Sequence, residues 1–360
     1  MQAAAAGKFS PEIGFDEVLT LNKILSKYDF DFFCVEGVRS AFKIITDKGV
    51  FCMKKLGRGY TRALKSFFII EHLNNKGFHN TLSFYPAKDG TIFIRNKKST
   101  YYMTHWIEGR ESSFNNLEDV LKSAEFMAEF HIAAKGIASA EHFKIRSNYA
   151  KTPKDLQLKI KDMEKIKKLL DIKLEKDSFD EVYGENLESV IAEAKKIVDC
   201  LKATDMEEYL RTMEEEKYIC HDSFYYQNIL VGNNDELYII DLESCLFDIP
   251  MIDLGSYIRR MLTKSKYAWD FDLCRKIIES YEKKRKLSQL ELQLLYFIII
   301  FPHKFWRLGK KRYIKVKNWS NERYKRKLRK LLELNKYKNE FSDCYKAFYE
   351  IDSRATDCMN

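Results

Sequence analysis

The sequence predicts an α+β fold of two lobes, with a small antiparallel β-sheet lobe at residues 1–103 and a large, mostly α-helical lobe at residues 104–360. Short β-rich runs separated by turn residues gather in the first part of the chain, whereas apolar positions at helical spacing dominate the rest. One pair of strands between residues 228 and 241 interrupts these helices. Because we find no internal repeat and no low-complexity linker, we expect two lobes of one domain.

The β-rich lobe is expected to contain a hairpin, because two β-rich runs at 40–46 and 50–55 flank turn residues at 47–49. Its other expected elements are helices at 15–28 and 61–76 and strands that begin near residues 30, 82, 91 and 101. In the second lobe we expect helices at 117–135 and 152–210, and helical structure from residue 251 onward.

The composition is that of a globular protein, and the chain shows no expected membrane span. With 45% hydrophobic and 14% aromatic residues, 360 residues can bury a large core. The longest apolar run, residues 294–301, is too short to cross a bilayer. The N-terminus lacks the charged start and long apolar centre of a secretion signal, so we expect a cytoplasmic protein. Eight singly placed cysteines without metal-like spacing predict reduced thiols.

The formal charge of +9 comes from one segment, because residues 302–338 hold fifteen Lys and Arg against two Glu. Aromatic residues interleave with these cations: Trp306, Tyr313, Trp319 and Tyr324. Such a stripe can neutralise phosphates of a nucleic acid or another polyanion. We prefer a solvated helix face with inward-packed aromatics, because leucines recur at helical spacing between residues 328 and 334. Docking on an acidic partner stays open.

The segment from His221 to Leu230 and the following run that ends at Asp241 resemble the catalytic loop and metal-binding strand of kinase-like phosphotransferases. In that chemistry an Asn and an Asp hold the Mg²⁺ ions that neutralise the transferring phosphoryl group. Asn228 and Asp241 occupy these two positions. Asp241 follows an apolar strand, where a carboxylate needs a cation or a donor network. The alternative for Asn228 is a turn-capping role.

The catalytic position departs from the pattern of these kinases. The aminoglycoside phosphotransferase-like loop has its catalytic Asp five residues before the Asn, and that place is Ser223 here. Asp222 lies one residue early and is the alternative base. A serine hydroxyl is not ionised at neutral pH and cannot replace a carboxylate as a general base. We therefore keep Asp222 and Ser223 as the candidate catalytic residues and leave the activity open.

Lys54 ends a strand just before a helix that contains Glu71, which is the spacing of the kinase Lys–Glu pair that holds the α- and β-phosphates. Lys55 is the competing residue, but side chains alternate faces along a strand, so only one lysine can face the cleft. We choose Lys54. An ordinary exposed ion pair between abundant residues is the alternative.

Two further segments are candidates for nucleotide contact. Residues 36–40 are placed as a phosphate-covering loop, but they contain only one glycine, Gly37, where such loops normally have three. This predicts weak or altered nucleotide binding, or an ordinary strand turn. The segment that includes Met103 and His105 is expected to join the lobes and to offer its backbone to an adenine edge. Trp106 is expected to be a packing anchor.

Across most of its length the chain resembles the CotS family of spore coat proteins, which are relatives of the aminoglycoside and choline kinase fold. The resemblance rests on Lys54, Glu71, residues 104–110, 128–131, 220–230, 240–243 and 253–255, and the segment that begins at Pro302. It implies a bilobal protein kinase-like fold and a protein that is made in the mother-cell cytoplasm and then laid onto the spore coat. It also implies other coat proteins as partners.

Three functions stay open at this stage. The first is a structural coat protein whose kinase fold is degenerate, because Ser223 replaces the catalytic Asp. The second is an active phosphotransferase that uses ATP and Mg²⁺ on a small hydroxyl compound or a coat protein. The third is polyanion binding through the basic segment, with nucleic acid the less favoured partner.

Asp253 is expected to brace the catalytic-loop segment by accepting backbone hydrogen bonds.

Overall fold

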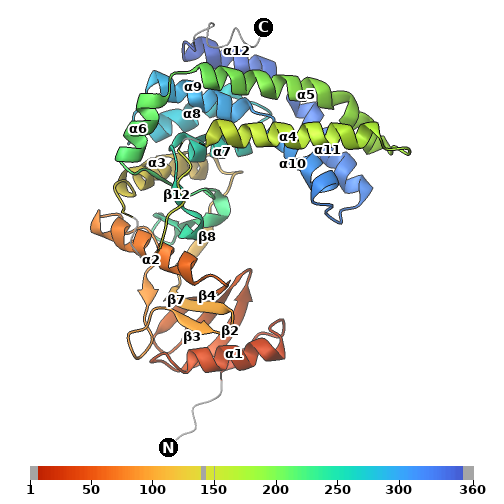
Figure 1. Cartoon of the computed structure of the whole chain (residues 1–360). Helices are drawn as coiled ribbons and strands as arrows, with labels where there is room; N and C mark the ends of the chain where they lie inside the picture. The colour runs from red at the N-terminus through yellow and green to blue at the C-terminus, as the bar shows by residue number, and fades with distance from the viewer. Residues whose placement is uncertain (1–6, 139–142, 150, 352–360) are drawn as a thin grey trace, which may run out of the picture. The chain divides into compact units, whose positions relative to one another are not determined.

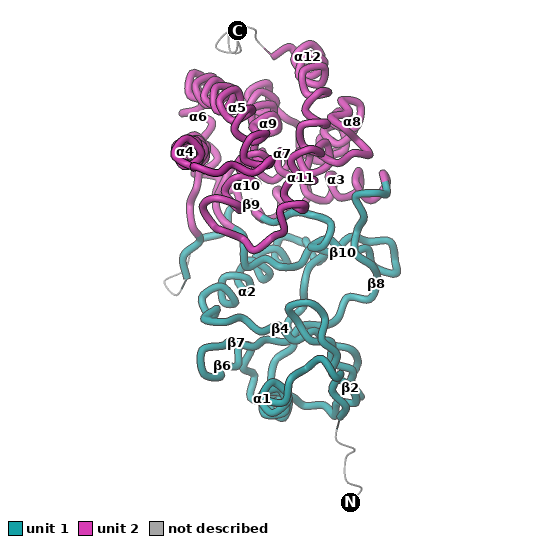
Figure 2. Tube along the Cα trace, turned by 90° about the vertical axis from the view of Figure 1, so that its right-hand side faces the viewer, with its two compact units in different colours: residues 1–116, 136–145, 223–245 teal, residues 117–135, 146–222, 246–360 magenta. Residues whose placement is uncertain are grey.

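The computed structural model describes residues 7–138, 143–149 and 151–351. The chain forms two compact units, which Figure 2 shows in different colours. The first unit comprises residues 1–116, 136–145 and 223–245, and the second comprises residues 117–135, 146–222 and 246–360. The chain therefore leaves the first unit and returns to it twice. The lobe boundary expected at residues 103 and 104 stays a prediction.

A mainly antiparallel sheet dominates the first unit. Its strands follow the order β1-β2-β3-β4-β7-β5, and β6 also pairs with β7. The sheet strands are β1 (Lys8–Phe9), β2 (Phe32–Val38), β3 (Ala41–Thr46), β4 (Gly49–Gly57), β5 (Phe84–Tyr85), β6 (Ile94–Asn96) and β7 (Ser99–His105). Helices α1 (Phe15–Leu25) and α2 (Tyr60–Asn75) belong to the same unit. The expected hairpin at 40–55 is confirmed, since β3 and β4 pair from Ala41 with Lys54 to Thr46 with Gly49.

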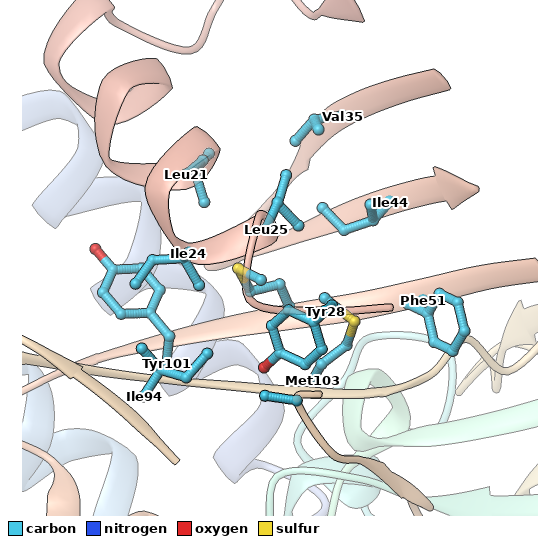
Figure 3. Close-up of a cluster of buried hydrophobic side chains, with 12 residues drawn as sticks. Leu21, Ile24, Leu25, Tyr28, Val35, Ile44, Phe51, Ile94, Tyr101 and Met103 are labelled. Carbon is cyan, nitrogen blue, oxygen red and sulfur yellow. The ribbon is translucent and has the colours of Figure 1, made fainter. Parts of the chain in front are cut away.

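Alternation along β4 and β7 gives the sheet one apolar face. Phe51 and Met53 of β4, and Tyr101 and Met103 of β7, are buried in a cluster with residues of α1 (Figure 3). Their neighbours in each strand point to the opposite face, because strand side chains have a period of two. That second face carries the candidate site.

A smaller sheet completes the first unit. It has the order β11-β10-β8 and consists of β8 (Gly109–Glu111), β10 (Ile229–Gly232) and β11 (Leu237–Ile239). Gly109 has φ +150°, and a Cβ there would overlap the carbonyl oxygen of Val231. Only glycine therefore fits the point where β8 meets β10. Two short 3₁₀ turns flank the hairpin: η1 (Tyr226–Asn228) and η2 (Leu242–Ser244).

The second unit is mostly helical, with one short strand pair of β9 (Ile219–Cys220) and β12 (Leu246–Phe247). Its helices are α3 (Leu117–Ala133), α4 (Thr152–Asp171), α5 (Ser178–Ala203), α6 (Glu207–Glu215), α7 (Met251–Leu262), α8 (Phe271–Glu282), α9 (Gln289–Ile300), α10 (His303–Gly309), α11 (Asn321–Asn335) and α12 (Lys338–Phe348). A π-helical turn, η3 (Lys310–Ile314), follows α10. The long helices α4 and α5 pack side by side (Figure 1).

Local sequence explains where several of these helices begin. Asp177 and Asp180 form a capping box before α5, and Ser288 and Glu291 form another before α9.

Helix α10 approaches α5 closely at Gly309, where a Cβ would overlap the hydroxyl of Tyr183. In α11 the leucines at 328, 331 and 334 are buried, so the preferred interpretation of a packed helix in the basic segment is confirmed.

Among the described residues, no helix combines the length and the apolar character needed to cross a membrane.

Candidate functional site

A pocket of about 290 Å³ lies within the first unit, on the face of the sheet opposite the apolar cluster. Strand β4 contributes Cys52 and Lys54, and β7 contributes Tyr102 and Thr104. The remaining walls are lined by residues 38–41, 105–107, 109–111, 227–228, 230 and 240–241, together with Leu82. The pocket thus combines a sheet face with the ends of the β10–β11 hairpin.

Lys54 is the charged centre of this pocket. Its Nζ lies 2.5 Å from Oδ1 of Asp241 and 2.9 Å from Oε1 of Glu243. The Glu243 carboxylate also accepts a hydrogen bond from the hydroxyl of Tyr102. The side chain of Glu243 is only 7% exposed, whereas that of Asp241 is 43% exposed. One carboxylate therefore holds the lysine from within, and the other remains open to a ligand.

The electrostatics of this cluster follow from burial and from the paired charges. Burial disfavours the charged form of Lys54, but the carboxylates of Glu243 and Asp241 outweigh it and raise the pKa of the lysine. Burial, opposed by Lys54, raises the pKa of Glu243. Burial and then the charge of Glu243 raise the pKa of Tyr102 well above its usual value. Lys54 therefore stays protonated and Tyr102 stays a hydrogen-bond donor at neutral pH.

The expected pair between Lys54 and Glu71 is wrong. Glu71 is exposed on α2, and Lys54 forms its ion pairs in the described structure with Asp241 and Glu243. The choice between the two lysines follows the predicted alternation. Lys55 lies on the other face of β4, where its Nζ is 2.5 Å from Glu17 of α1.

Asn228 and Asp241 both line the pocket and are placed by the same hairpin. The amide of Ile240 donates a 3.0 Å hydrogen bond to the carbonyl oxygen of Asn228, which links the two segments. The Nδ2 group of Asn228 donates to the carbonyl oxygen of Ser223, so its Oδ1 faces away from that contact as an acceptor. Asp241 adopts φ +70°, a left-handed conformation that Asp tolerates better than most residues. An amide oxygen and a carboxylate are ligands that Mg²⁺ accepts.

The two candidate catalytic residues belong to different units. Ser223 is partly buried in the first unit, and its carbonyl oxygen accepts the hydrogen bond of Asn228. Asp222 is exposed, has φ +63° and lines a pocket of the second unit. It is not among the residues that line the pocket of the first unit.

Asp253 braces the backbone that leads to Asp222. Its Oδ2 accepts a 2.6 Å hydrogen bond from the amide of His221, and its Oδ1 accepts a 3.0 Å bond from the amide of Asp222. The ring of His131 lies 3.3 Å from Oδ2. Burial raises the pKa of Asp253, but its hydrogen bond to His131 and the nearby donors outweigh burial and lower it. The expected bracing role is confirmed.

The remaining predicted contact residues lie at different depths. Gly37 pairs with Phe42 inside the β2–β3 ladder, and its amide donates to Oγ of Ser10, so it does not line the pocket. The turn residues after it do, because residues 38–41 form one wall. Met103 is buried in the apolar cluster, whereas His105 is exposed and lines the pocket.

Comparisons with known proteins agree with this architecture. The family model described as "Spore coat putative kinase YutH" matches residues 24–343. The chain belongs to this spore coat family. Its sequence is 25% identical over 340 residues to spore coat protein S of Bacillus subtilis (strain 168), which covers 92% of this chain and 95% of the relative. The expected resemblance to spore coat proteins is therefore confirmed, and the assignment to the spore coat follows at the level of the family.

Solved structures similar to this family member are phosphotransferases. The aminoglycoside phosphotransferase from Alicyclobacillus acidocaldarius subsp. acidocaldarius DSM 446 has a TM-score of 0.79 at 20% identity, over 91% of this chain and 95% of that chain. Spectinomycin phosphotransferase in complex with ADP and spectinomycin has a TM-score of 0.64 at 13% identity, over 91% and 98%. These likenesses establish the fold alone, and the expected α+β, bilobal protein kinase-like fold class is confirmed.

Sequence reasoning missed two members of the pocket cluster in this spore coat protein. Glu243 is the buried partner of Lys54, and Tyr102 is its hydrogen-bond donor. The signal for Glu243 was its position two residues after Asp241. The signal for Tyr102 was its place between two core residues of β7, which predicts the opposite face.

Proposed function

We propose that this spore coat protein binds ATP with Mg²⁺ in the first-unit pocket and transfers phosphoryl groups poorly, because its catalytic loop lacks a carboxylate at Ser223. The observation that carries the proposal is Lys54, which is fixed between Asp241 and Glu243 in the pocket wall. A lysine and a metal-binding Asp at this spacing are the groups that hold the phosphates in kinases.

Each residue has a separate task in this proposal. Lys54 binds the α- and β-phosphates while Glu243 orients its ammonium group. Asp241 and Oδ1 of Asn228 hold the metal ion, which supplies charge neutralisation for the phosphates when it is bound. Tyr102 fixes Glu243 through a hydrogen bond. Residues 38–41 and 105–107 line the same pocket and would contact the base and sugar of a bound nucleotide.

Poor transfer follows from the side chain at the base position. A general base contributes about 10²–10⁴-fold when its carboxylate or imidazole reaches the acceptor hydroxyl. Ser223 offers a hydroxyl that stays protonated, and its carbonyl oxygen is engaged with Asn228. The site therefore retains groups for nucleotide binding and lacks the group that would accept the proton. A role as a nucleotide-binding coat component, assembled with other coat proteins, fits this combination.

Binding can be tested by a thermal-shift titration with ATP in the presence and absence of Mg²⁺. We expect the wild-type protein to be stabilised with a Mg²⁺ dependence, because a ligand that binds only the folded state raises the melting temperature. Asp241→Asn should abolish the Mg²⁺ dependence. Asp235→Asn is the matched control, since Asp235 is an exposed turn residue with φ +60° in the same hairpin. An unchanged melting temperature at millimolar ATP would contradict the proposal.

Transfer can be tested by restoring the missing carboxylate. We expect Ser223→Asp to raise ATP turnover, within the roughly 10²–10⁴-fold range of a general base, and Ser223→Asn to leave it unchanged. Turnover is measured as ADP release with water or added hydroxyl compounds as acceptors. Equal turnover of the Asp and Asn variants would contradict the assignment of Ser223 as the defect.

A second candidate function is an active phosphotransferase with Asp222 as the base. Its exposed carboxylate and its place in the wall of a second-unit pocket favour this hypothesis. In that case the wild-type protein turns over ATP with an acceptor, and Asp222→Asn abolishes turnover while ATP binding persists. Polyanion binding by residues 302–338 is less favoured, because Tyr324 and three of the four leucines of α11 are buried.

A further inference from the structure

A second pocket, of about 350 Å³, lies entirely within the helical unit. Its walls come from the segment before α4, the first turns of α4, the loop residue Asp222, helix α7 and helix α10. These segments are far apart in the sequence and meet only in the folded unit. The volume matches the lower end of the range for small-molecule sites.

Cations dominate the lining of this pocket. Six Lys and Arg side chains contribute to it: Arg146, Lys159, Arg259, Arg260, Lys304 and Arg307. The carboxylates in the wall are Asp155, Asp222 and Asp248. Burial raises the pKa of Asp248 to about 7, so part of its negative charge is absent at neutral pH. The pocket therefore has a net positive charge.

Four of these cations have no ion pair within the part of the chain that the structure describes. Within the described residues, Lys159, Arg259, Lys304 and Arg307 form no salt bridge with a carboxylate. Arg259 donates to the carbonyl oxygen of Ile298 at 2.6 Å, and Lys304 donates to that of Thr263 at 3.0 Å. The Nζ of Lys159 lies 5.4 Å from the centre of the Trp306 ring, and the charges of Asp155 and Asp222 act on it without an ion pair. The groups are thus positioned by neutral partners, and their charges remain available.

The charges also oppose one another. Burial and then the charge of Arg259 lower the pKa of Lys159 to about 8. Burial, followed by Arg259, Lys159 and the nearby arginines, lowers the pKa of His303 to about 2, so this ring is neutral. A protein that gathers cations against burial and mutual repulsion relieves both when an anion enters. His303 then offers a ring N–H or a lone pair to the same ligand.

We propose that this second-unit pocket binds a small, multiply charged anion that carries phosphate or carboxylate groups. Lys159 and Arg307 supply charge to it from α4 and α10, and Arg259 supplies a guanidinium that its hydrogen bonds already orient. Guanidinium groups suit both oxyanions because they donate in a fixed fork. The volume limits the ligand to a small molecule. The inference stands apart from nucleotide binding in the first unit.

The test is isothermal titration of the full-length protein with inorganic pyrophosphate and, in parallel, with citrate, at pH 7 without divalent cations. We expect Lys159→Gln and Arg307→Gln each to raise the Kd by at least about ten-fold, as expected for a lost hydrogen bond to a charged group. Arg307 is exposed, so its variant tests the site independently of the partly buried Lys159. Tighter pyrophosphate binding assigns a phosphorylated ligand, and tighter citrate binding assigns a polycarboxylate.

Two controls separate this site from others. Lys165→Gln removes the same charge from the exposed face of the same helix and should leave the Kd unchanged. Lys54→Met removes the cation that the proposed function places at the phosphates of a nucleotide, so this variant measures how much pyrophosphate binds in the first-unit pocket instead. Binding lost in Lys54→Met but retained in both pocket variants would overturn the inference, as would no binding of either anion at millimolar concentration. Mg²⁺-dependent ATP binding is measured separately, so the failure of this inference and the failure of the proposed function are distinguishable.

Discussion

The pockets of the two units are similar in volume, about 290 and 350 Å³, but they compensate charge in opposite ways. In the first unit, Lys54 lies between two carboxylates, and its pKa is raised. In the second unit, Lys159 lies among other cations, and its pKa is lowered to about 8. The first arrangement is complete in the protein alone. The second gains most from an oppositely charged ligand.

This difference in charge compensation affects the free energy of unfolding. Removing one member of a buried, hydrogen-bonded ion pair destabilises the fold, because the remaining charge has no partner. A cluster of like charges is costly to keep, so removing one member stabilises the fold. Removal of a lysine should therefore lower the free energy of unfolding in the first pocket and raise it in the second. The following expected outcomes run from the largest change in the free energy of unfolding to the smallest.

The largest effect is expected at Asp253, a buried carboxylate of the second unit whose charge is compensated by hydrogen-bond donors. We expect Asp253→Ala to lower the free energy of unfolding by about 4 kcal/mol, because two backbone amides and His131 lose a charged acceptor. Urea unfolding at pH 7 measures this change. Asp272→Ala removes an exposed carboxylate of α8 and serves as the control, with a loss below about 1 kcal/mol. Similar losses in the two variants would contradict the bracing role.

Lys54 and Lys55 offer a matched pair on opposite faces of one strand. We expect Lys54→Met to lower the free energy of unfolding by about 3 kcal/mol, because it leaves the buried carboxylate of Glu243 without its cation. Lys55→Met breaks a more exposed pair with Glu17 and should cost about 1 kcal/mol or less. Urea unfolding without nucleotide measures both. Lys54→Met combined with Glu243→Gln should recover part of the loss, and no recovery would argue against the pair.

Lys159 tests the uncompensated pocket, and its effect depends on pH. The folded state lowers its pKa from 10.5 to about 8, so the unfolded chain binds its proton more tightly. The penalty is therefore fully present below pH 8 and is lost as pH rises toward 10.5. We expect Lys159→Gln to stabilise the anion-free protein by about 1–2 kcal/mol at pH 7 and by much less at pH 10.

The control for this prediction is Lys165→Gln, which should change stability little at either pH because Lys165 is exposed on the same helix. Thermal unfolding in buffers without phosphate, sulfate or citrate measures both variants. A loss of stability in Lys159→Gln at pH 7 would show that its ring contacts with Trp306 and Phe301 outweigh the repulsion.

The smallest effect is expected at the rim of the first pocket. Arg39 lies 2.5 Å from Glu111, but their side chains are 54% and 35% exposed. We expect Arg39→Gln to lower the free energy of unfolding by about 0.5 kcal/mol, because solvent and salt screen such pairs. Urea unfolding at low and high salt measures the change, which should shrink at high salt. A loss as large as that of Lys54→Met would remove the distinction between rim and interior.

The sequence predicted much of the fold, because local chemistry specifies local structure. The β3–β4 hairpin follows from turn residues between two β-rich runs, and the alternation within β4 correctly assigned Lys54 and Lys55 to different faces. The burial of Leu328, Leu331 and Leu334 in α11 follows from their helical spacing. The motif around Asn228 and Asp241 led to the kinase-like fold, since its residues recur in that architecture.

The parts that sequence reasoning did not predict depend on contacts between distant segments. Glu243 replaces Glu71 as the partner of Lys54, although 189 positions separate Lys54 and Glu243 in the chain. Gly37 was expected near phosphates, but its amide donates a hydrogen bond to Oγ of Ser10. The cationic pocket brings α4, α7 and α10 together, and no single segment reveals it. Such sites depend on tertiary packing, which local propensity does not encode.

Helix α9 has a consequence for how this protein must be made. Residues 294–301 are apolar or aromatic throughout, and all are buried in the native unit. The same run is rich in residues that favour β-structure and lacks charge and proline, so an unfolded or nascent chain presents a segment suited to intermolecular strand pairing. Pro302 and the first lysines and arginines of the basic segment follow it directly. They act as gatekeepers, because proline and clustered charge oppose the growth of aggregates from that end.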